Sequence, residues 1–227
     1  MSPSLLEVEN LGLCLAGRWL FRHLNLSIPP SCFVAITGPS GVGKTSLLRL
    51  LGSQLSPSEG SVQSCLLHGQ HASMIFQDLQ LADGASTLTN ALGGCLARHS
   101  SLRTLFGFPQ NEKERCTEWL VKFGLANKAR QWASTLSRGE RQRLAICRSM
   151  LSSPTLLLAD EPVASLDSDW ADRTLEILSH AQKETGGSLV CSLHDEEQVQ
   201  QFADFVLRLD CDNPNQWTWE EVSPPQV

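Results

Sequence analysis

The chain has 227 residues, of which 41% are hydrophobic and 19% are charged, and its formal net charge is −6. This composition supports a globular domain with a real core, and the acidic balance argues against a mainly electrostatic role on nucleic acid or membrane surfaces. No apolar run approaches the roughly 20 residues that cross a bilayer, and the N-terminus lacks the pattern of a secretory signal. Eight cysteines without a C-x-x-C pair indicate reduced core residues in a cytosolic protein.

Strands dominate the beginning of the chain. Residues 5–15 and 19–28 alternate apolar and polar side chains, which predicts a β-hairpin with one buried face. "CFVAIT" (32–37) is a continuous apolar run of strand length. "KTSLLRLLGS" follows a glycine-rich turn and predicts a helix that ends at Gly52, whereas residues 56–75 are loop-rich and strand-like.

The middle of the chain, from about Leu79 to Leu136, is expected to be helical. Asn111 followed by Glu114 fits a capped helix N-terminus. Apolar residues then recur at i, i+3, i+4 and i+7, and a glycine closes the helix. These residues are Cys116, Trp119, Leu120, Phe123 and Gly124.

Short apolar runs return at 155–160 ("TLLLAD") and 188–193 ("SLVCSL"), and their lack of alternation is typical of parallel strands covered on both faces. A helix is expected between them, over about 169–184. "FVLRLD" and "QWTWEEV" predict a final hairpin around Asp212-Asn213-Pro214. The chain therefore reads as an α/β core with a helical insertion.

The strongest motif is "GPSGVGKT" (38–45), which matches G-x-x-x-x-G-K-[ST] between a predicted strand and a predicted helix. Its glycines let backbone N–H groups turn toward phosphate oxygens, and the helix N-terminus adds partial positive charge. Lys44 is expected to reach the β- and γ-phosphates of ATP, and Thr45 to offer a hydroxyl to Mg²⁺. The alternative is a glycine turn with a surface lysine. The predicted nucleotide residues in this segment are Gly38, Pro39, Ser40, Gly41, Val42, Gly43, Lys44, Thr45 and Ser46.

Polar side chains at three further strand ends complete the candidate site. Asp160 ends a buried strand and is expected in the Mg²⁺ shell, and Glu161 follows it as a group that deprotonates water. His194 follows "SLVCSL", and Gln77 follows "SMIF". The competing interpretations are solvated acids at a strand end, a structural histidine and a surface amide. Adjacent carboxylates repel each other without a cation, which favours the functional interpretation.

Six features occur along the chain in this order: "GPSGVGKT", Gln77, "LSRGE" (136–140), "LLLADEP", "SLD" (165–167) and His194. In order and rough spacing they follow the motifs of the ATP-binding-cassette ATPases, which the chain resembles over about residues 5–210. The resemblance implies one domain with a RecA-like P-loop NTPase core, a mostly parallel sheet, an N-terminal antiparallel β-subdomain and an inserted helical subdomain. Residues 1–77 and 155–227 would form the core with the β-subdomain. Residues 78–154 would form the helical subdomain, whose surface near Gln77 receives the coupling helix of a permease.

The resemblance also implies roles for the site residues. Lys44 and Thr45 would bind ATP and Mg²⁺, and Gln77 and Asp160 would complete the metal site. Glu161 would act as general base, and His194 would contact the γ-phosphate and keep water and Glu161 in position.

"LSRGERQR" (136–143) has no evident catalytic role within its own chain, and a solvated helix start is the plain alternative. The resemblance implies a head-to-tail dimer in which Ser137 and Gly139 of one chain face the γ-phosphate bound by the other. Asp167 would link the two sites. Two residues depart from the family pattern, namely Arg138 at a usual glycine and Glu140 at a usual glutamine. Arg138 either attracts phosphate or points outward, and Arg141 and Arg143 are expected to offset the charge of Glu140.

The family usually places an aromatic residue on the adenine, often tyrosine, and this chain has no tyrosine. Trp19 is the candidate base-stacking residue, although it and Phe21 also suit the hairpin core. The segment between Lys44 and Gln77 is short for the family, which indicates a trimmed β-subdomain loop.

Local likeness is greatest to the ATPases of phosphonate-type importers. It implies a peripheral subunit on the cytoplasmic face of the membrane, working with a second copy of itself, membrane permease subunits and a substrate-binding protein, without nucleic acid. An exporter or lipoprotein-release ATPase and a non-transport ABC ATPase remain open. A small-molecule kinase would lack "LSRGE" and "SLD".

Overall fold

The computed structural model describes residues 4–98 and 107–222. The chain divides into two compact units. The sheet unit comprises residues 1–74, 155–161 and 175–227, and the helical unit comprises residues 75–154 and 162–174.

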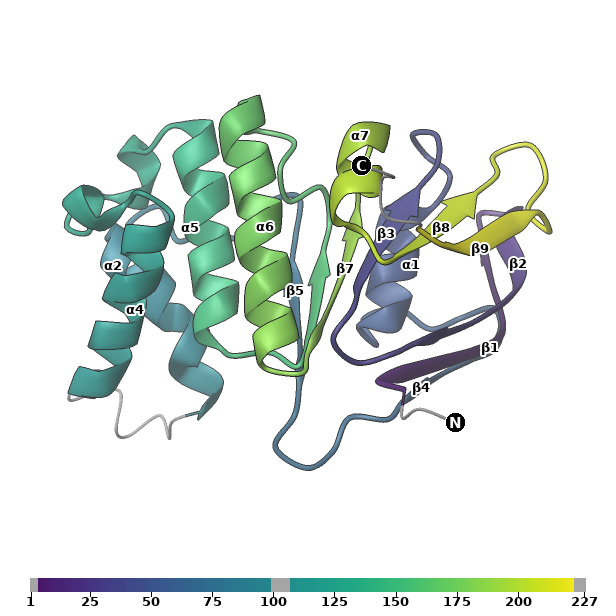
Figure 1. Cartoon of the computed structure of the whole chain (residues 1–227), viewed down its shortest axis with the longest axis horizontal. Coiled ribbons are helices and arrows are strands. Elements are labelled where there is room, and N and C mark those ends of the chain that lie inside the picture. Colours follow the sequence, from purple (N-terminus) through teal and green to yellow (C-terminus); the bar gives the residue numbers. More distant parts are fainter. Residues whose placement is uncertain (1–3, 99–106, 223–227) are drawn as a thin grey trace. The chain divides into compact units, whose positions relative to one another are not determined.

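The strands and helices are labelled in Figure 1. They are β1 (Leu6–Leu15), β2 (Arg18–Ile28), β3 (Phe33–Thr37), β4 (Glu59–Ser64), β5 (Ala72–Ile75), β6 (Leu156–Ala159), β7 (Ser188–Ser192), β8 (Phe205–Leu209) and β9 (Trp217–Glu221). The α-helices are α1 (Lys44–Leu51), α2 (Thr87–Leu92), α4 (Gln110–Lys122), α5 (Arg138–Leu151), α6 (Ser168–Glu184) and α7 (Glu196–Phe202). Short 3-10 helices span Gly93–Arg98, Ala126–Lys128 and Ala133–Thr135.

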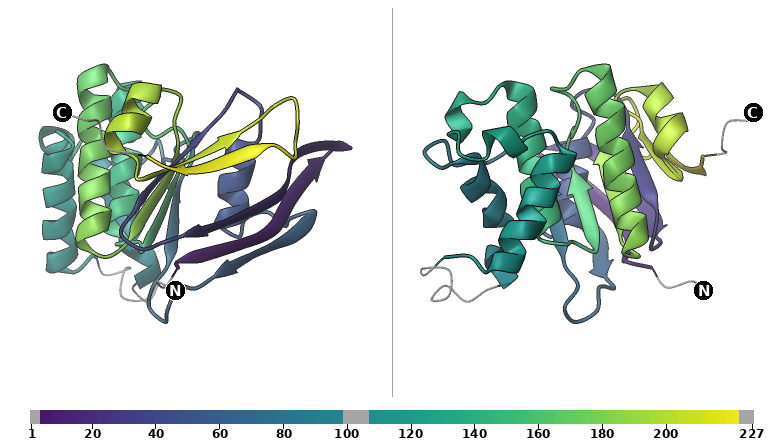
Figure 2. Two further views of the ribbon diagram at one scale, coloured as in Figure 1. Left: turned by 45° about the vertical axis from the view of Figure 1, so that its right-hand side comes forward. Right: turned by 60° about the vertical axis from the view of Figure 1, so that its left-hand side comes forward.

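The sheet unit contains two sheets. The predicted N-terminal hairpin is present, and β4 joins it to give a three-stranded antiparallel sheet in the order β2-β1-β4 (Figure 2). The larger sheet has six strands in the order β5-β6-β7-β3-β8-β9. Its central strands β6, β7, β3 and β8 run parallel, and β9 closes the edge antiparallel to β8. This arrangement confirms the predicted mostly parallel core with an antiparallel β-subdomain.

Burial explains why the central strands lack alternation. Every residue of β3, β6 and β7 is buried, as expected for parallel strands covered on both faces. In α1 the apolar side chains of Leu47, Leu48 and Leu50 are at most 2% exposed. The helix ends at Gly52, as predicted, and a Cβ there would lie 3.1 Å from Leu158 Cδ1. Glycine thus lets the end of α1 pack closely on β6.

The helical unit is built around α5, which contacts both α2 and α4. The predicted apolar face of α4 is confirmed, because Cys116, Leu120 and Phe123 are at most 1% exposed. The predicted cap at Asn111 is wrong. The N-cap lies two residues earlier, at Pro109, and the helix begins at Gln110. The φ of Pro109 is −54°, and its carbonyl accepts from the N–H of Glu112. Among the described residues, no helix has the length and apolarity to cross a membrane.

Candidate active site

Three adjacent strands of the larger sheet end side by side. β6, β7 and β3 are parallel and in register, with Ala159 paired to Cys191 and Ile36 to Ser192. Because the carboxyl ends of parallel strands share one edge of the sheet, the segments that follow them meet there. Those segments carry "GPSGVGKT", the pair Asp160–Glu161, and His194.

The loop after β3 wraps around a lysine. Gly38 and Gly43 have φ values of 139° and 111°, and a Cβ on Gly38 would lie 2.7 Å from the carbonyl oxygen of Leu209. Only glycine fits this turn. Lys44, the first residue of α1, is buried, and its Nζ donates to the carbonyl oxygens of Gly38 at 2.7 Å and Pro39 at 3.2 Å. The ammonium is therefore held inside the loop, beside the N-terminus of a helix.

The other predicted nucleotide residues line the same loop and the first turn of α1. Val42 is buried, Thr45 and Ser46 are half-buried, and Pro39, Ser40 and Gly41 are exposed. On β2, Phe21 is 1% exposed and belongs to the core. Trp19 is half-buried, with the guanidinium of Arg22 4.2 Å from the ring centroid. One face of the Trp19 ring is thus covered by a cation.

The two carboxylates after β6 have different environments. Asp160 is 2% exposed, and its Oδ1 accepts from the hydroxyl of Ser192 at 2.9 Å. Glu161 is half-buried, and its Oε1 lies 2.7 Å from Nε2 of His194. Its backbone is in the left-handed region, with φ at 49°. A buried acid and a more accessible acid that contacts a histidine therefore stand next to each other.

Charge links the lysine to this pair. Burial lowers the pKa of the Lys44 ammonium, while the carboxylates of Glu161 and Asp160 raise it. The net shift is downward because desolvation is the largest effect. The structure thus brings Lys44, Asp160, Glu161 and His194 together at one edge of the sheet.

"LSRGERQR" forms the start of α5 in the helical unit. Ser137 is the N-cap, and it makes a capping box with Glu140: Ser137 Oγ accepts from the N–H of Glu140 at 3.3 Å, and the Glu140 carboxylate accepts from the N–H of Ser137 at 2.9 Å. The expectation that Arg141 and Arg143 offset Glu140 holds for Arg143 only through charge, because Glu140 acts to raise the pKa of Arg143 against a larger lowering by burial. The direct partner is Lys128, whose Nζ lies 2.5 Å from Glu140 Oε1 and lowers the pKa of that carboxyl.

Arg141 and Arg143 are used elsewhere in the helical unit. Arg141 donates to Asp83 at 2.6 Å. Arg143 donates to the carbonyl of Phe123 at 3.0 Å, and its guanidinium lies 3.9 Å from the ring centroid of Trp170. Arg141 is thus paired with Asp83, whereas Arg143 also attracts Glu140 by charge.

The "SLD" segment lies close to this helix start. A Cβ on Gly139 would be 3.1 Å from the carbonyl oxygen of Ser165, so the first turn of α5 approaches the "SLD" segment closely. Asp167 is exposed, and its Oδ1 accepts from the N–H of Trp170 at 3.0 Å in the first turn of α6. Arg138 is exposed.

Gln77 lies in the helical unit just after β5, and its side chain is exposed. The chain beyond it turns through Leu79 and Gln80, which have φ values of 58° and 46°. Arg148 of α5 holds this turn by donating to the carbonyl oxygens of Gln80 at 2.6 Å and Leu79 at 2.7 Å. The segment that carries Gln77 is therefore attached to the helix that begins at the "LSRGE" motif.

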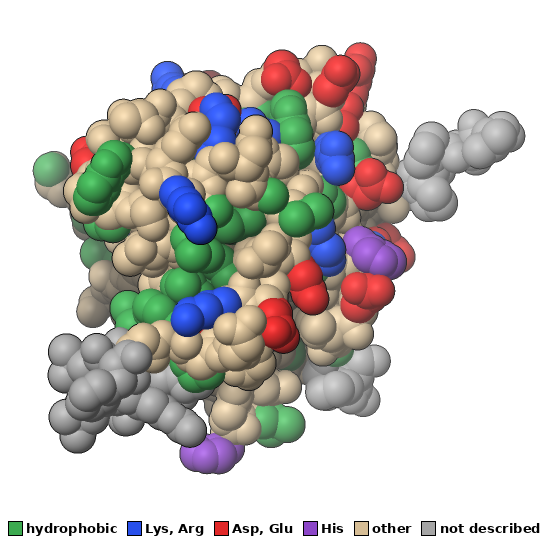
Figure 3. All heavy atoms as spheres, turned by 90° about the vertical axis from the view of Figure 1, so that its left-hand side faces the viewer, with side chains coloured by type: hydrophobic (Ala, Val, Ile, Leu, Met, Phe, Trp, Pro, Cys, Tyr) green, Lys and Arg blue, Asp and Glu red, His purple; other side chains and the backbone are tan. Residues whose placement is uncertain are grey.

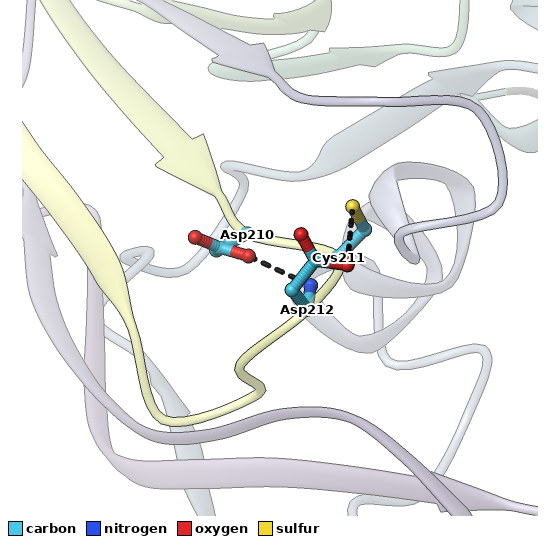
Figure 4. Close-up of side chains that lie close together, drawn as sticks. All are labelled: Asp210, Cys211 and Asp212. Carbon is cyan, nitrogen blue, oxygen red and sulfur yellow. Dashed lines mark hydrogen bonds between the residues drawn. The ribbon is translucent and has the colours of Figure 1, made fainter.

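A second group of ligand-type side chains lies in the turn between β8 and β9 (Figure 4). The ligand atoms of Asp210, Cys211 and Asp212 lie within 4.8 Å of one another. Asp210 Oδ1 accepts from the N–H groups of Asp212 at 2.7 Å and Asn213 at 3.2 Å. Such bonds are those of an Asx turn, and they account for the position of Asp210 within the hairpin.

Residues 21–164, which include the loop around Lys44 and Asp160 with Glu161, match the family model described as ABC transporter. The chain belongs to the ABC transporter family. This ABC ATPase is 37% identical over 220 residues to the phosphite import ATP-binding protein PxtA of Stutzerimonas stutzeri, covering 92% of this chain and 80% of the relative. It is 34% identical over 220 residues to the phosphonates import ATP-binding protein PhnC 2 of Oceanobacillus iheyensis, covering 91% of this chain and 87% of the relative.

Solved structures agree with the fold of the ABC ATPase. The dimeric structure of MJ0796, a bacterial ABC transporter cassette, has a TM-score of 0.83 at 24% identity and covers 96% of this chain and 99% of its own. A dimeric post-hydrolysis state of the same cassette, bound to ADP and Pi, has a TM-score of 0.80 at 23% identity, over 96% and 99% of the two chains. The predicted P-loop NTPase fold is confirmed. The chain is an ATP-binding and ATP-hydrolysing subunit of an ABC transporter.

The sequence did not predict several contacts in the ABC ATPase. Ser192 bonds both residues of the acid pair, Lys128 neutralises Glu140, and Arg148 holds the turn after Gln77. Helix α7 was also missed, although Asp195 followed by two glutamates is a typical helix start and Asp195 accepts from the N–H of Glu197. A polar residue inside an otherwise apolar strand was the available signal for Ser192.

Proposed function

We propose that this ABC ATPase powers the import of a phosphonate, or of a related phosphorus oxyanion such as phosphite, through a separate permease. The names of the relatives support the substrate class, because PxtA is a phosphite importer subunit and PhnC 2 a phosphonates importer subunit. The observation that carries the ATPase chemistry is the contact between Glu161 and His194 beside Asp160 and Lys44.

The residues at this edge of the sheet have the ligand atoms that a nucleotide and a divalent cation would require. Thr45 and Asp160 offer hydroxyl and carboxylate oxygens, which are hard ligands suited to Mg²⁺, and Gln77 would complete the set. Lys44 would exchange its two carbonyl contacts for phosphate oxygens. When bound, Mg²⁺ supplies charge neutralisation at the β- and γ-phosphates. Backbone N–H groups of the segment from Gly38 to Ser46, except Pro39, which has none, would hold the phosphates, and the half-buried ring of Trp19 would stack on adenine.

In this mechanism, Glu161 takes a proton from the attacking water. Its pairing with His194 supports that role, because a histidine at 2.7 Å fixes the carboxylate side chain in one position. His194 would also contact the γ-phosphate. Asp160 is buried and accepts from Ser192, and its proposed task is to bind Mg²⁺, so the two acids would have different tasks.

A head-to-tail dimer would bring the "LSRGE" motif of one copy to the nucleotide of the other. Within the capping box, Ser137 uses an acceptor lone pair, so its hydroxyl hydrogen stays available as a donor to a γ-phosphate. Lys128 offsets the charge of Glu140, which favours the approach of a polyanion. Gly139 would present its backbone N–H, and Asp167 would connect the two sites.

The permease is expected to dock on the helical unit. Large apolar side chains of that unit are exposed at Leu96 (48%), Val121 (59%) and Trp132 (56%). The face drawn in Figure 3 also carries hydrophobic side chains between lysines and arginines. Contiguous apolar patches typically mark protein contacts, and a permease that docks on this unit would cover these side chains. The ABC ATPase would then work as a peripheral subunit on the cytoplasmic face of the membrane, alongside a substrate-binding protein.

The Glu161→Gln variant tests the ATPase assignment. It keeps the size of the side chain but removes the base, and general-base catalysis contributes about 10²–10⁴ in rate, so kcat should fall by about that factor. ATP binding should persist, as measured with a fluorescent ATP analogue. Glu184→Gln is the matched control, because Glu184 is exposed at the end of α6 and should keep wild-type turnover. Turnover by Glu161→Gln within a few-fold of wild type would overturn the assignment.

The substrate class is tested in proteoliposomes that contain the ABC ATPase and its permease. Binding protein loaded with methylphosphonate or phosphite should stimulate ATP hydrolysis, whereas binding protein loaded with sulfate should not. Stimulation only by a substrate supplied on the ATPase side would indicate export and contradict the proposal.

A further inference from the structure

Ser192 occupies the last position of β7 and is fully buried. Its hydroxyl makes two hydrogen bonds. Its Oγ accepts from the backbone N–H of Glu161 at 2.8 Å and donates to Oδ1 of Asp160 at 2.9 Å. Because its one hydrogen goes to Asp160 and a lone pair takes the N–H of Glu161, the hydroxyl has a single orientation.

Glu161 needs such support. Its φ of 49° places a non-glycine residue in the left-handed region, a conformation that persists only when its surroundings hold it. The bond from its N–H to Ser192 holds the backbone, and His194 holds the side chain at Oε1. Both contacts come from the end of β7 and the residues just after it. The end of β7 and the residues after it thus hold Glu161 at its backbone N–H and at its carboxylate.

The second bond fixes Asp160. With Oδ1 bound to Ser192, rotation of the Asp160 carboxylate is restrained. Partners that orient a metal ligand in this way are nearly as important as the ligand itself. One hydroxyl therefore controls the positions of both acids.

We propose that Ser192 is a positioning residue for ATP hydrolysis, which couples the geometry of the expected metal ligand Asp160 to that of the expected base Glu161. The inference rests on the proposed roles of these two acids. Ser192 acts through them and does not touch the nucleotide. Its loss should reduce turnover and weaken the dependence of nucleotide binding on Mg²⁺.

Ser188, at the opposite end of β7, offers a matched control for the Ser192 variants. Ser188 is also fully buried, and its Oγ donates to the carbonyl of Pro29 at 2.7 Å and accepts from the N–H of Cys32 at 3.3 Å. The two serines are four positions apart, which is about 13 Å along a strand. Ser188→Ala therefore removes the same kind of bridge from the same strand, away from the acids.

The experiment uses the purified full chain with Ser192→Ala, Ser192→Thr, Ser192→Cys, Ser188→Ala and Glu161→Gln. Three properties are measured: the melting temperature, the affinity for trinitrophenyl-ATP in Mg²⁺ and in EDTA, and the kcat with its Mg²⁺ dependence. Ser192→Ala should lower kcat about 10–100-fold and raise the half-saturating Mg²⁺ concentration, with binding in EDTA unchanged. Ser192→Thr should stay within a few-fold of wild type. Ser188→Ala should lose thermal stability to a similar degree but keep its kcat.

The proposal is overturned if Ser192→Ala keeps wild-type kcat and Mg²⁺ dependence, or if Ser188→Ala loses as much activity. Should Ser192→Ala not fold, Ser192→Cys decides, because a thiol keeps the shape with a much weaker donor. Wild-type behaviour of that variant overturns the proposal, and reduced Mg²⁺ dependence supports it. If Glu161→Gln turns over like wild type, the proposed function itself fails. If Glu161→Gln is inactive while Ser192→Ala is normal, only the role of Ser192 fails.

Discussion

Arg148→Met should destabilise the helical unit, because it removes the two bonds that hold the turn after Gln77. The bond to the carbonyl of Leu79 is part-buried and charge-assisted, and such bonds contribute about 1.5–3 kcal/mol. The bond to the carbonyl of Gln80 is exposed, so it adds only about 0.5–1 kcal/mol. Methionine replaces most of the apolar stem, which limits any cavity. The expected loss in the free energy of unfolding is therefore about 2–4 kcal/mol.

Urea unfolding followed by tryptophan fluorescence measures this loss. Arg138→Met is the control, because Arg138 is an exposed arginine on the same helix and its replacement should change the free energy by at most about 0.5 kcal/mol. The two residues of the turn have positive φ, so without Arg148 they should also relax. Faster amide exchange over residues 77–80 would report that relaxation. An Arg148→Met protein as stable as the Arg138→Met protein would refute the reasoning.

Two further predictions concern the helical unit. Gly94→Ala should cost about 2 kcal/mol or more in urea unfolding, because its Cβ would lie 1.8 Å from the carbonyl oxygen of Arg148. Gly93→Ala, whose Cβ would meet no atom closer than 3.9 Å, should change stability by less than about 1 kcal/mol, and equal losses would contradict this packing argument. Because Lys128 lowers the pKa of Glu140, the pair stabilises the fold above the ordinary glutamate pKa of about 4.3, and this contribution is lost as the pH falls through the lowered value. Lys128→Met should therefore reduce the difference in unfolding free energy between pH 7 and pH 3, and an unchanged difference would count against the pairing.

The sequence predicts the fold well where one residue pattern has one physical cause. The apolar runs of β3, β6 and β7 are buried on both sides, so their lack of alternation identifies them as parallel strands. The loop that ends at Lys44 follows from glycine spacing alone. These elements also place Asp160 and His194 at neighbouring strand ends.

The errors arise where several weak local signals compete or where partners are distant. Asn111 and Pro109 both suit a helix start, and the fixed φ of proline decided the outcome. Lys128 reaches Glu140 from a separate turn 12 residues away, which no periodicity predicts. Ser192 and Glu161 are 31 residues apart, so only the pairing of β6 with β7 reveals their contact.

The left-handed backbone at Glu161 has a consequence for protein engineering. Glycine and asparagine adopt this conformation at lower cost than glutamate, so Glu161→Gly or Glu161→Asn would relieve strain in the folded chain. A library screened for heat resistance alone would thus enrich variants that have lost the carboxylate beside His194. At position 161, stability favours glycine or asparagine, whereas turnover requires glutamate. Directed evolution of this subunit therefore has to select for stability and turnover together.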